Sequence, residues 1–394
     1  MTTGGYLDSQ ALRRLFAACP ADALLACSSD SVFVASGHRT WLDEKMMTWM
    51  SSPFGDNSPR AGYAVVMPDC SVGLVANAVV AADASACRPA WLLLFGRGQP
   101  YSDPEAALVA LLRTMGLAGK TIGWEQQALS QKTCDRVIDA LPDCRFVDGS
   151  ITWRLLKSVK SPAAIRALTR ACELTEHLLN KSLPRWSSRG EPKAARRAFA
   201  TGLAAAGAEL DHFVWGMPDG GVSAHHAPPD SAAALFFDAG ARVEGYYSDT
   251  GMTLLHAPCS LQDAQRYADA AGVLEAGRAC LLTGELPSSA WLAMQSILPD
   301  VHLVAQGHGL GTSIREWPFF GKPTDQHVRD GLSSYSIDQM LVAGMVVNLE
   351  VAGNWPDGSS VQIEQTFLIS GDGPRLLAEQ PRQCMLDLGG RVCA

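Results

Sequence analysis

Two short apolar segments of the sequence each carry one aspartate: Leu235-Phe236-Phe237-Asp238-Ala239-Gly240 and Gly245-Tyr246-Tyr247-Ser248-Asp249. The midpoint between the two aspartates falls at Val243 and Glu244, just before Gly245. If the chain folds back at this point, the segments form a β-hairpin. The hairpin is then expected to place the carboxylates of Asp238 and Asp249 opposite each other on neighbouring strands.

A second pair of acidic residues has the same arrangement. Val346-Val347-Asn348-Leu349-Glu350 and Val361-Gln362-Ile363-Glu364 flank Trp355-Pro356-Asp357-Gly358. The Asp-Gly pair is a strong hairpin-turn signal and lies at the centre of the interval. The sequence therefore predicts a second hairpin that carries Glu350 and Glu364.

A candidate histidine ligand lies between the two pairs, in Gly307-His308-Gly309-Leu310-Gly311. Four carboxylates and one imidazole suit two divalent cations, and the absence of thiolate ligands favours Mn²⁺, Fe²⁺, Co²⁺ or Zn²⁺. A single aspartate on a strand is usually a solvated residue. Asp238 follows an apolar run and Glu350 ends one, however, so both are expected to be buried, and a buried unpaired charge is costly. A metal ion or another strong partner is therefore expected.

The segments that carry these five residues resemble the five motifs of the pita-bread metallopeptidases, the superfamily of aminopeptidase P, prolidase, methionine aminopeptidase and creatinase. Residues 154–162 are similar to the linker through which the creatinase and prolidase branch enters its catalytic domain. The resemblance implies an α/β amino-terminal domain in residues 1–153, followed by an α+β pita-bread catalytic domain in residues 154–394.

The resemblance also implies roles for individual residues. Asp249 and Glu364 would bridge two metal ions, Asp238 would bind one of them, and His308 and Glu350 would complete the other. Glu350 would also move the proton from the attacking water to the leaving nitrogen. The family keeps a histidine upstream of the first aspartate that hydrogen-bonds the substrate. Both His225 and His226 are candidates for it, and His226 is favoured because two prolines follow it closely.

Three positions depart from the family pattern. Arg315 stands where these peptidases usually keep a second histidine, seven residues after the metal-binding one, and Met252 and Gln362 each stand where arginine is common. The departures indicate an unusual small substrate. Because an arginine offers a permanent, five-donor cation, Arg315 is expected to bind an anionic group of that substrate.

Three functions follow from this sequence. The favoured one is a dinuclear metal-dependent hydrolase that cleaves an amide bond in a small peptide or related molecule, similar to Xaa-Pro aminopeptidases and dipeptidases. The second is a creatinase-like or lyase-like enzyme acting on a small metabolite. The third is a non-catalytic binding scaffold, and the complete set of metal ligands argues against it.

Composition limits the partners and the compartment. The 394 residues suit two domains, and the formal net charge of −8 disfavours a nucleic-acid partner. No apolar stretch is long enough to span a bilayer, and no secretory signal is visible. The eleven cysteines are scattered without a Cys-x-x-Cys pair, which is typical of reduced thiols and predicts a cytoplasmic protein.

The first 150 residues alternate apolar and helical runs, which is typical of an α/β domain. A loop at residues 36–41 is expected to follow an apolar strand, and its His38 and Arg39 are candidate substrate contacts. By the resemblance, the protein is a homodimer whose amino-terminal domain helps to wall the partner's active site. The predicted strands are 22–27, 63–67, 90–95 and 121–125, and the predicted helices are 9–19, 104–115, 162–180, 193–207 and 261–282.

Overall fold

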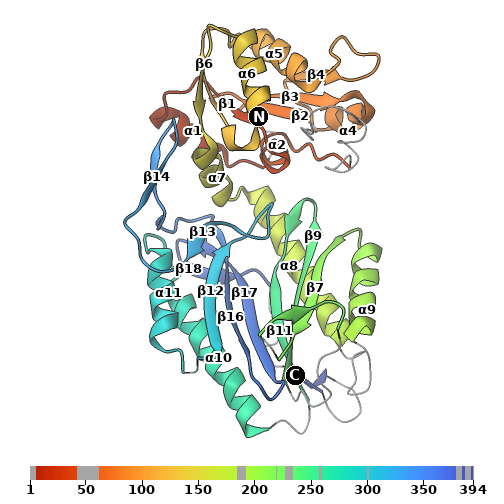
Figure 1. Cartoon of the computed structure of the whole chain (residues 1–394), viewed down its shortest axis with the longest axis vertical. Coiled ribbons are helices and arrows are strands. Elements are labelled where there is room, and N and C mark those ends of the chain that lie inside the picture. The colour runs from red at the N-terminus through yellow and green to blue at the C-terminus, as the bar shows by residue number, and fades with distance from the viewer. Residues whose placement is uncertain are drawn as a thin grey trace. The chain divides into compact units, whose positions relative to one another are not determined.

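The computed structural model divides the chain into two compact units (Figure 1). Unit 1 comprises Met1–Pro162 and His327–Ser336, and unit 2 comprises Ala163–Gln326 and Ile337–Ala394. The predicted domain boundary, between residues 153 and 154, lies inside helix α7 (Ser150–Ser158). It remains a prediction. The structure describes residues 6–41, 62–183, 192–218, 220–226, 234–256, 260–299, 301–378, 384–386 and 392–393.

Unit 1 is an α/β unit built on a mixed sheet. Its described strands are β1 (Ala23–Ala26), β2 (Gly62–Val66), β3 (Val72–Asn77), β4 (Trp91–Phe95), β5 (Thr121–Trp124) and β6 (Arg145–Asp148). They lie in the order β4-β3-β2-β1-β5-β6, with β1 antiparallel to β2 and parallel to β5. All four residues of β1 are buried, as expected for a central strand covered on both faces.

Helices surround this sheet. The described helices of unit 1, besides α7, are α1 (Ser9–Ala18), α2 (Ser29–Ser36), α4 (Ala81–Ala86), α5 (Pro104–Thr114) and α6 (Gln131–Ala140), with short 3₁₀ turns at Ala78–Val80 and Gln126–Ala128. The helices and strands predicted for this region agree with the structure to within one residue at each end, except the strand before residue 36. Strands β3 and β6 have no counterpart in the prediction.

The loop with His38 and Arg39 follows helix α2, so the predicted strand before it is wrong. The Ser28 hydroxyl accepts a hydrogen bond from Ser31 N at 3.2 Å, which caps the amino terminus of the helix. Gly37 ends the helix with a left-handed φ of 78°. The apolar residues between these caps are buried on every side of the helix, so their pattern does not separate helix from strand.

A hairpin from late in the sequence belongs to unit 1. It consists of β14 (His327–Arg329) and β15 (Ser334–Ser336). Asp330 at its turn is buried and accepts hydrogen bonds from the backbone nitrogens of Thr152 at 2.7 Å, Leu332 at 2.9 Å and Ser333 at 2.8 Å. One buried carboxylate thus organises the hairpin turn and joins it to α7.

Unit 2 contains two sheets. The first has the order β20-β19-β11-β9-β7-β8, with β10 beside β9, and the second has the order β13-β12-β16-β17-β18. The first consists of β7 (Glu209–Gly216), β8 (Val222–Ser223), β9 (Ala234–Val243), β10 (Tyr246–Tyr247), β11 (Thr250–His256), β19 (Cys384–Leu386) and β20 (Val392–Cys393). The second consists of β12 (Leu303–Gly309), β13 (Glu316–Phe320), β16 (Val346–Asn354), β17 (Ser360–Ser370) and β18 (Gly373–Leu376).

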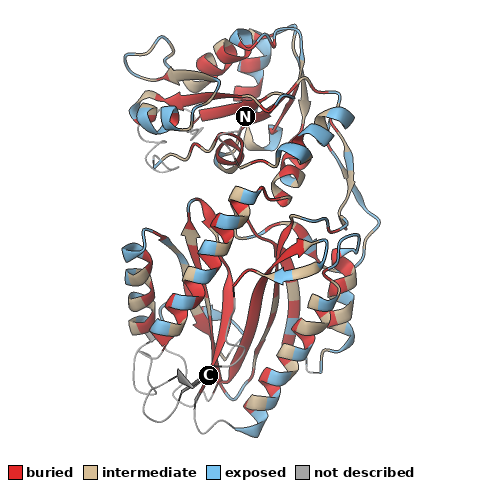
Figure 2. Cartoon of the chain, turned by 180° about the vertical axis from the view of Figure 1, so that it is seen from behind, coloured by how far each residue is buried: buried red, intermediate tan, exposed pale blue. Residues whose placement is uncertain are grey.

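Four described helices cover the two sheets: α8 (Pro162–Ser182), α9 (Pro192–Ala205), α10 (Leu261–Ala279) and α11 (Pro287–Ser296). Helices α8 and α9 contribute Leu179 and Phe199 to an apolar core shared with Phe237 of β9. Helix α10 packs on β16 and β17, and α11 packs on β12 and β13. Figure 2 shows that the strands of both sheets are largely buried, whereas the helices keep exposed outer faces. Within the described residues, no helix has the length and apolar character needed to cross a membrane.

The two sheets of unit 2 meet where β11 lies beside β17. The Thr253 hydroxyl donates to Gln362 O at 2.8 Å, and Gln362 N donates to that hydroxyl at 2.9 Å. This seam brings the two acid-bearing hairpins together.

Candidate metal centre

The first acidic hairpin is formed by β9 and β11. Its turn lies at Glu244 and Gly245, whose φ angles are 51° and 88°. Asp238 therefore pairs with Gly251 rather than with Asp249, and the prediction that the two aspartates lie opposite each other is wrong. Two consecutive left-handed residues suit a two-residue hairpin turn. Because Gly245 adopts a left-handed φ easily, the turn lies one position later than the midpoint between Asp238 and Asp249.

This shift moves Asp249 by two residues relative to Asp238. Because side chains alternate between faces of a strand, an offset of two keeps both carboxylates on one face. The two acids are thus diagonal neighbours, close enough to share a ligand.

The second hairpin agrees with the prediction. Glu350 of β16 pairs directly with Glu364 of β17. Gly358 has a φ of 93° and its backbone nitrogen donates to Trp355 O at 3.0 Å, which closes the turn. On the other side of β16, β12 places His308 opposite Asn348.

The acids and histidines form two overlapping groups. Asp249, His308 and Glu364 offer ligand atoms that lie within 4.8 Å of one another, and so do His212, Asp238 and Asp249. Asp249 belongs to both groups. Its side chain is only 5% exposed, which leaves little solvent to stabilise its charge.

His308 presents a free ring nitrogen to this cluster. Its Nδ1 is 3.0 Å from Gly309 O, so this nitrogen carries the proton and donates it. Its Nε2 is buried without a hydrogen-bond partner and lies 3.6 Å from Asp249 Oδ2. A buried nitrogen lone pair beside a carboxylate is costly unless a cation lies between them, so these residues fit a metal ion.

The ionisation of the acids supports the same conclusion. Burial and the charge of Asp249 raise the pKa of Glu364 well above its ordinary value. Burial also raises the pKa of Glu350, to about 7, and the pKa of Asp249. Carboxylates held this close together in a buried site need positive charge to stay ionised at neutral pH.

The amide groups of two glutamines bind Glu350. Gln306 Nε2 donates to Glu350 Oε2 at 2.5 Å, and Gln362 Nε2 donates to Glu350 Oε1 at 3.3 Å. Gln362 Nε2 also donates to Glu364 Oε2 at 3.0 Å. The glutamine that replaces the family's usual arginine therefore contacts both acids of the second hairpin.

Met252, which also differs from the family pattern and also lies on a strand, does not contact these acids. It is buried in the apolar core with Phe237 and Leu254, so its replacement of arginine concerns core packing and not the surroundings of the acids. Of the three departures, Met252 therefore gives no support to an unusual substrate.

Arg315 lies at the edge of the cluster. Its Nη2 is 3.8 Å from Glu350 Oε2, and its side chain is 53% exposed. The neighbouring Glu316 is not its partner: Glu316 Oε1 accepts from the Thr312 hydroxyl and from Ser313 N, both at 3.0 Å. About half of the Arg315 side chain thus remains exposed to solvent beside the acids.

Neither His225 nor His226 belongs to the two ligand groups of unit 2. His225 and His226 are exposed, and neither ring forms a hydrogen bond or ion pair with the part of the chain that the structure describes. His38 and Arg39 belong to unit 1. The His38 ring is buried with both nitrogens unpartnered, and burial lowers its pKa. The roles of these four residues stay predictions.

His212, on β7, is a residue of the cluster that was not predicted from the sequence. Its Nε2 lies 2.8 Å from Asp238 Oδ1, and its Nδ1 lies 2.7 Å from Asp211 Oδ2. Burial opposes a charged imidazole, but hydrogen bonds to Asp211, Asp238 and Asp249 outweigh this effect and raise its pKa to about 12. The available signal was weak: the polar pair Asp211-His212 directly precedes the apolar run Phe213-Val214-Trp215.

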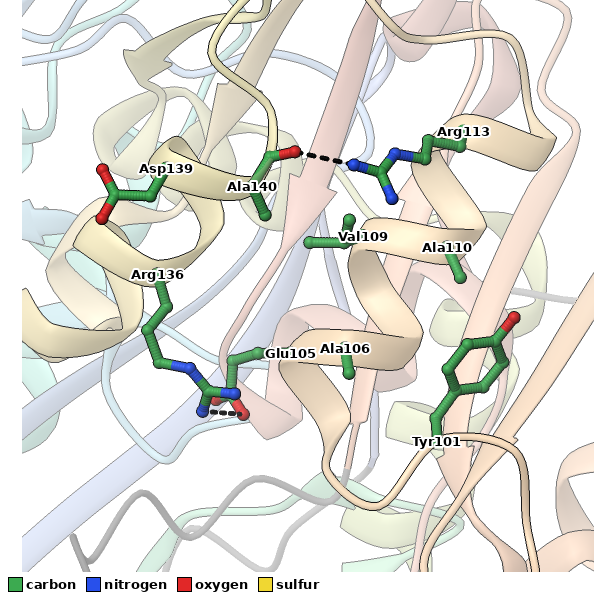
Figure 3. Close-up of a pocket in the computed structure, with 9 residues that line it drawn as sticks. All are labelled: Tyr101, Glu105, Ala106, Val109, Ala110, Arg113, Arg136, Asp139 and Ala140. Atoms are coloured by element: carbon green, nitrogen blue, oxygen red, sulfur yellow. Dashed lines mark hydrogen bonds and ion pairs between the residues drawn. The ribbon is translucent and has the colours of Figure 1, made fainter.

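One pocket in unit 1 is separate from the acids. It lies between α5 and α6, and its lining includes Tyr101, Glu105, Val109 and Arg136 (Figure 3). Arg136 Nη1 is 3.6 Å from Glu105 Oε2. None of its lining residues belongs to the metal cluster.

Residues 163–371, more than half of the chain, match the model of metallopeptidase family M24. The chain belongs to this family, and it is a metal-dependent hydrolase of the peptidase type.

Solved structures agree over nearly the whole chain. The X-Pro aminopeptidase of Thermotoga maritima is 16% identical, with a TM-score of 0.70 over 95% of this chain and 98% of its own. The prolidase of Pyrococcus horikoshii is 16% identical, with a TM-score of 0.69 over 95% and 98%. The N-terminal domain of a FACT complex subunit from chickpea (Cicer arietinum) is 15% identical, with a TM-score of 0.60 over 95% and 97%. No curated protein sequence matches the chain.

These likenesses confirm the predicted fold class, an α/β amino-terminal domain followed by an α+β pita-bread catalytic domain. At identities this low they show the fold alone. The side chains of the cluster must therefore carry the argument about function.

Proposed function

We propose that this protein hydrolyses an amide bond with the aid of two divalent metal ions, acting on Xaa-Pro dipeptides or similar small substrates. The observation that carries the proposal is the pair of overlapping ligand groups that share Asp249. In this proposal Asp238, Asp249, His308, Glu350 and Glu364 would hold the ions, with Asp249 and Glu364 shared between them as the family resemblance implies. Mn²⁺, Fe²⁺, Co²⁺ and Zn²⁺ suit such donors.

When bound, the two ions activate a water molecule and polarise the substrate carbonyl. Glu350 accepts the proton of the attacking water and passes it to the leaving nitrogen. Its position between Gln306 and Gln362 supports this role, because the two amides hold the carboxylate in one orientation. One of His225 and His226 is proposed to hydrogen-bond the substrate carbonyl.

Arg315 is proposed to bind an anionic group of the substrate, such as the free carboxylate of a dipeptide. Its side chain is half-exposed, and its guanidinium lies next to Glu350 with no second acidic partner among the described residues. A planar five-donor group can bind a carboxylate through two hydrogen bonds. This reading favours substrates in which the scissile bond and a carboxylate are close together.

We further propose that the protein is a cytoplasmic homodimer in which His38 and Arg39 help to bind substrate. Eight cysteines of the described chain are free thiols, which supports a reducing compartment. Light scattering at working concentration tests the dimer. A monomer with undiminished turnover would exclude it.

The function is tested with a panel of purified substrates. Xaa-Pro dipeptides, longer Xaa-Pro peptides, and small amidino, amide and sulfonium metabolites are incubated with protein loaded with Mn²⁺, Fe²⁺, Co²⁺ or Zn²⁺. We expect hydrolysis of Xaa-Pro dipeptides that is lost on chelation and in Asp249→Ala. Reaction in H₂¹⁸O should place one labelled oxygen in the acid product, which a lyase reaction would not do.

The proposal fails if fully loaded protein cleaves none of the amides. Turnover of a metabolite without incorporation of the label would favour the lyase-like alternative. Absence of bound metal and of all turnover would favour a binding scaffold.

A further inference from the structure

His212 reaches the cluster from strand β7, which carries none of the five predicted ligands. Strand β7 pairs with β9, and an irregularity between Leu210 and His212 lets His212 pair with Gly240. A Cβ on Gly240 would lie 2.5 Å from His212 Cε1, so the glycine leaves the space that the imidazole fills. The ring is thus packed over β9 and is only 21% exposed.

His212 and His308 each place Nε2 near a different carboxylate oxygen of Asp249. His212 Nε2 lies 3.4 Å from Asp249 Oδ1, and His308 Nε2 lies 3.6 Å from Asp249 Oδ2. In each ring the other nitrogen is 3.0 Å or less from an oxygen acceptor, Asp211 Oδ2 for His212 and Gly309 O for His308. This arrangement holds a proton on Nδ1 in both rings. The Nε2 of His308 has no hydrogen-bond partner, whereas the Nε2 of His212 lies 2.8 Å from Asp238 Oδ1 and would give up its proton to bind a metal.

We propose that His212 is a sixth protein ligand of the metal centre, one that binds the ion held by Asp238 and Asp249. Each ion then has one imidazole ligand, with Asp249 between them. The inference rests on the proposed dinuclear site and adds a residue that is absent from the set of five ligands.

Asp211 is then a positioning residue. Its carboxylate accepts the Nδ1 proton of His212, which fixes the ring orientation and makes Nε2 a stronger donor. A nitrogen ligand on both ions shifts the metal preference, because imidazole suits Zn²⁺ and Co²⁺ better than the oxygen-preferring Mn²⁺.

Metal binding tests the inference without relying on activity. Wild type, His212→Gln, Asp211→Asn and the matched control His177→Gln, an exposed histidine on α8, are stripped of metal and checked for folding by circular dichroism. Bound ions per chain are counted by elemental analysis, Zn²⁺ and Mn²⁺ affinities are measured by calorimetry, and the Co²⁺ absorption spectrum is recorded.

We expect wild type and His177→Gln to bind two ions with the same Co²⁺ spectrum. His212→Gln should lose one of the two ions at concentrations that saturate wild type, with a larger loss of affinity for Zn²⁺ than for Mn²⁺. Asp211→Asn should keep both ions but bind one of them about 10–100-fold more weakly. If His212→Gln does not fold, Asp211→Asn provides the test.

Two ions with unchanged affinities and spectrum in both variants would overturn the inference and leave the proposed function intact. One ion in wild type, with a second gained in His212→Gln, would also overturn it, because the imidazole would then occupy the place of a cation. Absence of metal from every variant would overturn the proposed function as well.

Discussion

Asp249 is the residue on which the metal centre depends most, because each of its carboxylate oxygens faces a different histidine. Its backbone carbonyl is also held, by Asn348 Nδ2 at 3.0 Å. We predict that Asp249→Asn lowers kcat/KM by more than about 10³-fold, equivalent to about 4 kcal/mol of transition-state stabilisation. Elemental analysis should show that fewer than two ions remain.

The matched control is Asp372→Asn, at an exposed turn after β17, which should keep both activity and metal. Circular dichroism should show that both variants are folded. A fully active Asp249→Asn protein would contradict the assignment of Asp249 as a ligand.

Arg315 allows a separate prediction about the substrate. Arg315→Ala should raise KM by an amount equivalent to about 1.5–3 kcal/mol, because one charge-assisted hydrogen-bonded contact is lost in a partly exposed site. Metal content should not change. Arg315→Lys should recover part of the affinity through its charge, and Arg315→His is expected to improve turnover of Xaa-Pro peptides that lack the anionic group. Unchanged KM in Arg315→Ala would show that the guanidinium does not contact substrate.

Among the elements, the β9–β11 hairpin controls where the first two acids lie. Gly245 has a φ of 88°, which other residues adopt at a cost. Gly245→Ala should reduce the free energy of unfolding by about 1–2 kcal/mol and should also weaken metal binding, because the turn sets the offset between Asp238 and Asp249.

Gly284 provides the matched control, since its φ is 94° and a Cβ there would meet nothing within 4 Å. Gly284→Ala should show a similar loss of stability in denaturant melts with unchanged metal affinity from calorimetry. Equal metal affinity in the two variants would show that the turn at Gly245 does not affect metal binding.

For the whole molecule, the buried acids predict how stability depends on pH. The pKa of Glu350 is raised from 4.5 to about 7 in the folded state, so the folded protein binds more protons than the unfolded chain between these values. The free energy of unfolding of the metal-free protein should therefore fall as pH rises through this range. The raised pKa of His212 acts in the same direction above pH 6.5, whereas the pKa of His308, lowered by burial, opposes it below pH 6.5.

Thermal melts at pH 5, 6, 7 and 8 check this prediction. The Tm of metal-free protein should decrease with pH, and added Zn²⁺ should raise Tm more at pH 8 than at pH 5, because ionised ligands bind the cation. A metal-free Tm that increases over this range would contradict it.

The hairpin that returns to unit 1 should contribute to the stability of that unit. Asp330→Ala removes three backbone hydrogen bonds to a buried carboxylate and should cost about 2–4 kcal/mol. In Asp330→Asn, an amide can keep the bonds from Leu332 and Ser333 but faces the Thr152 nitrogen with a donor, so an intermediate loss is expected. Hydrogen exchange should locate the effect in α7 and the hairpin. Equal stability of wild type and Asp330→Ala would exclude this role.

Local sequence signals accounted for much of the fold. Apolar runs, capping residues and glycine turns act over a few neighbours, so β1, α5 and the Asp-Gly hairpin could be predicted from the sequence. The strand expected before residue 36 failed because a short buried helix and a buried strand share one apolar pattern, and here the caps at Ser28 and Gly37 favour the helix.

The four acids and His308 could be recognised from the sequence because each lies in or next to a strand with its own local signal. Only the tertiary structure decided that Asp249 is offset from Asp238, that Met252 belongs to the core, and that His212 joins the cluster. Residues 212 and 238 are separated by a long connection, and their contact depends on the pairing of β7 with β9. Strand pairing over such a distance is set by the packing of whole sheets, so the sequence near either residue does not encode it.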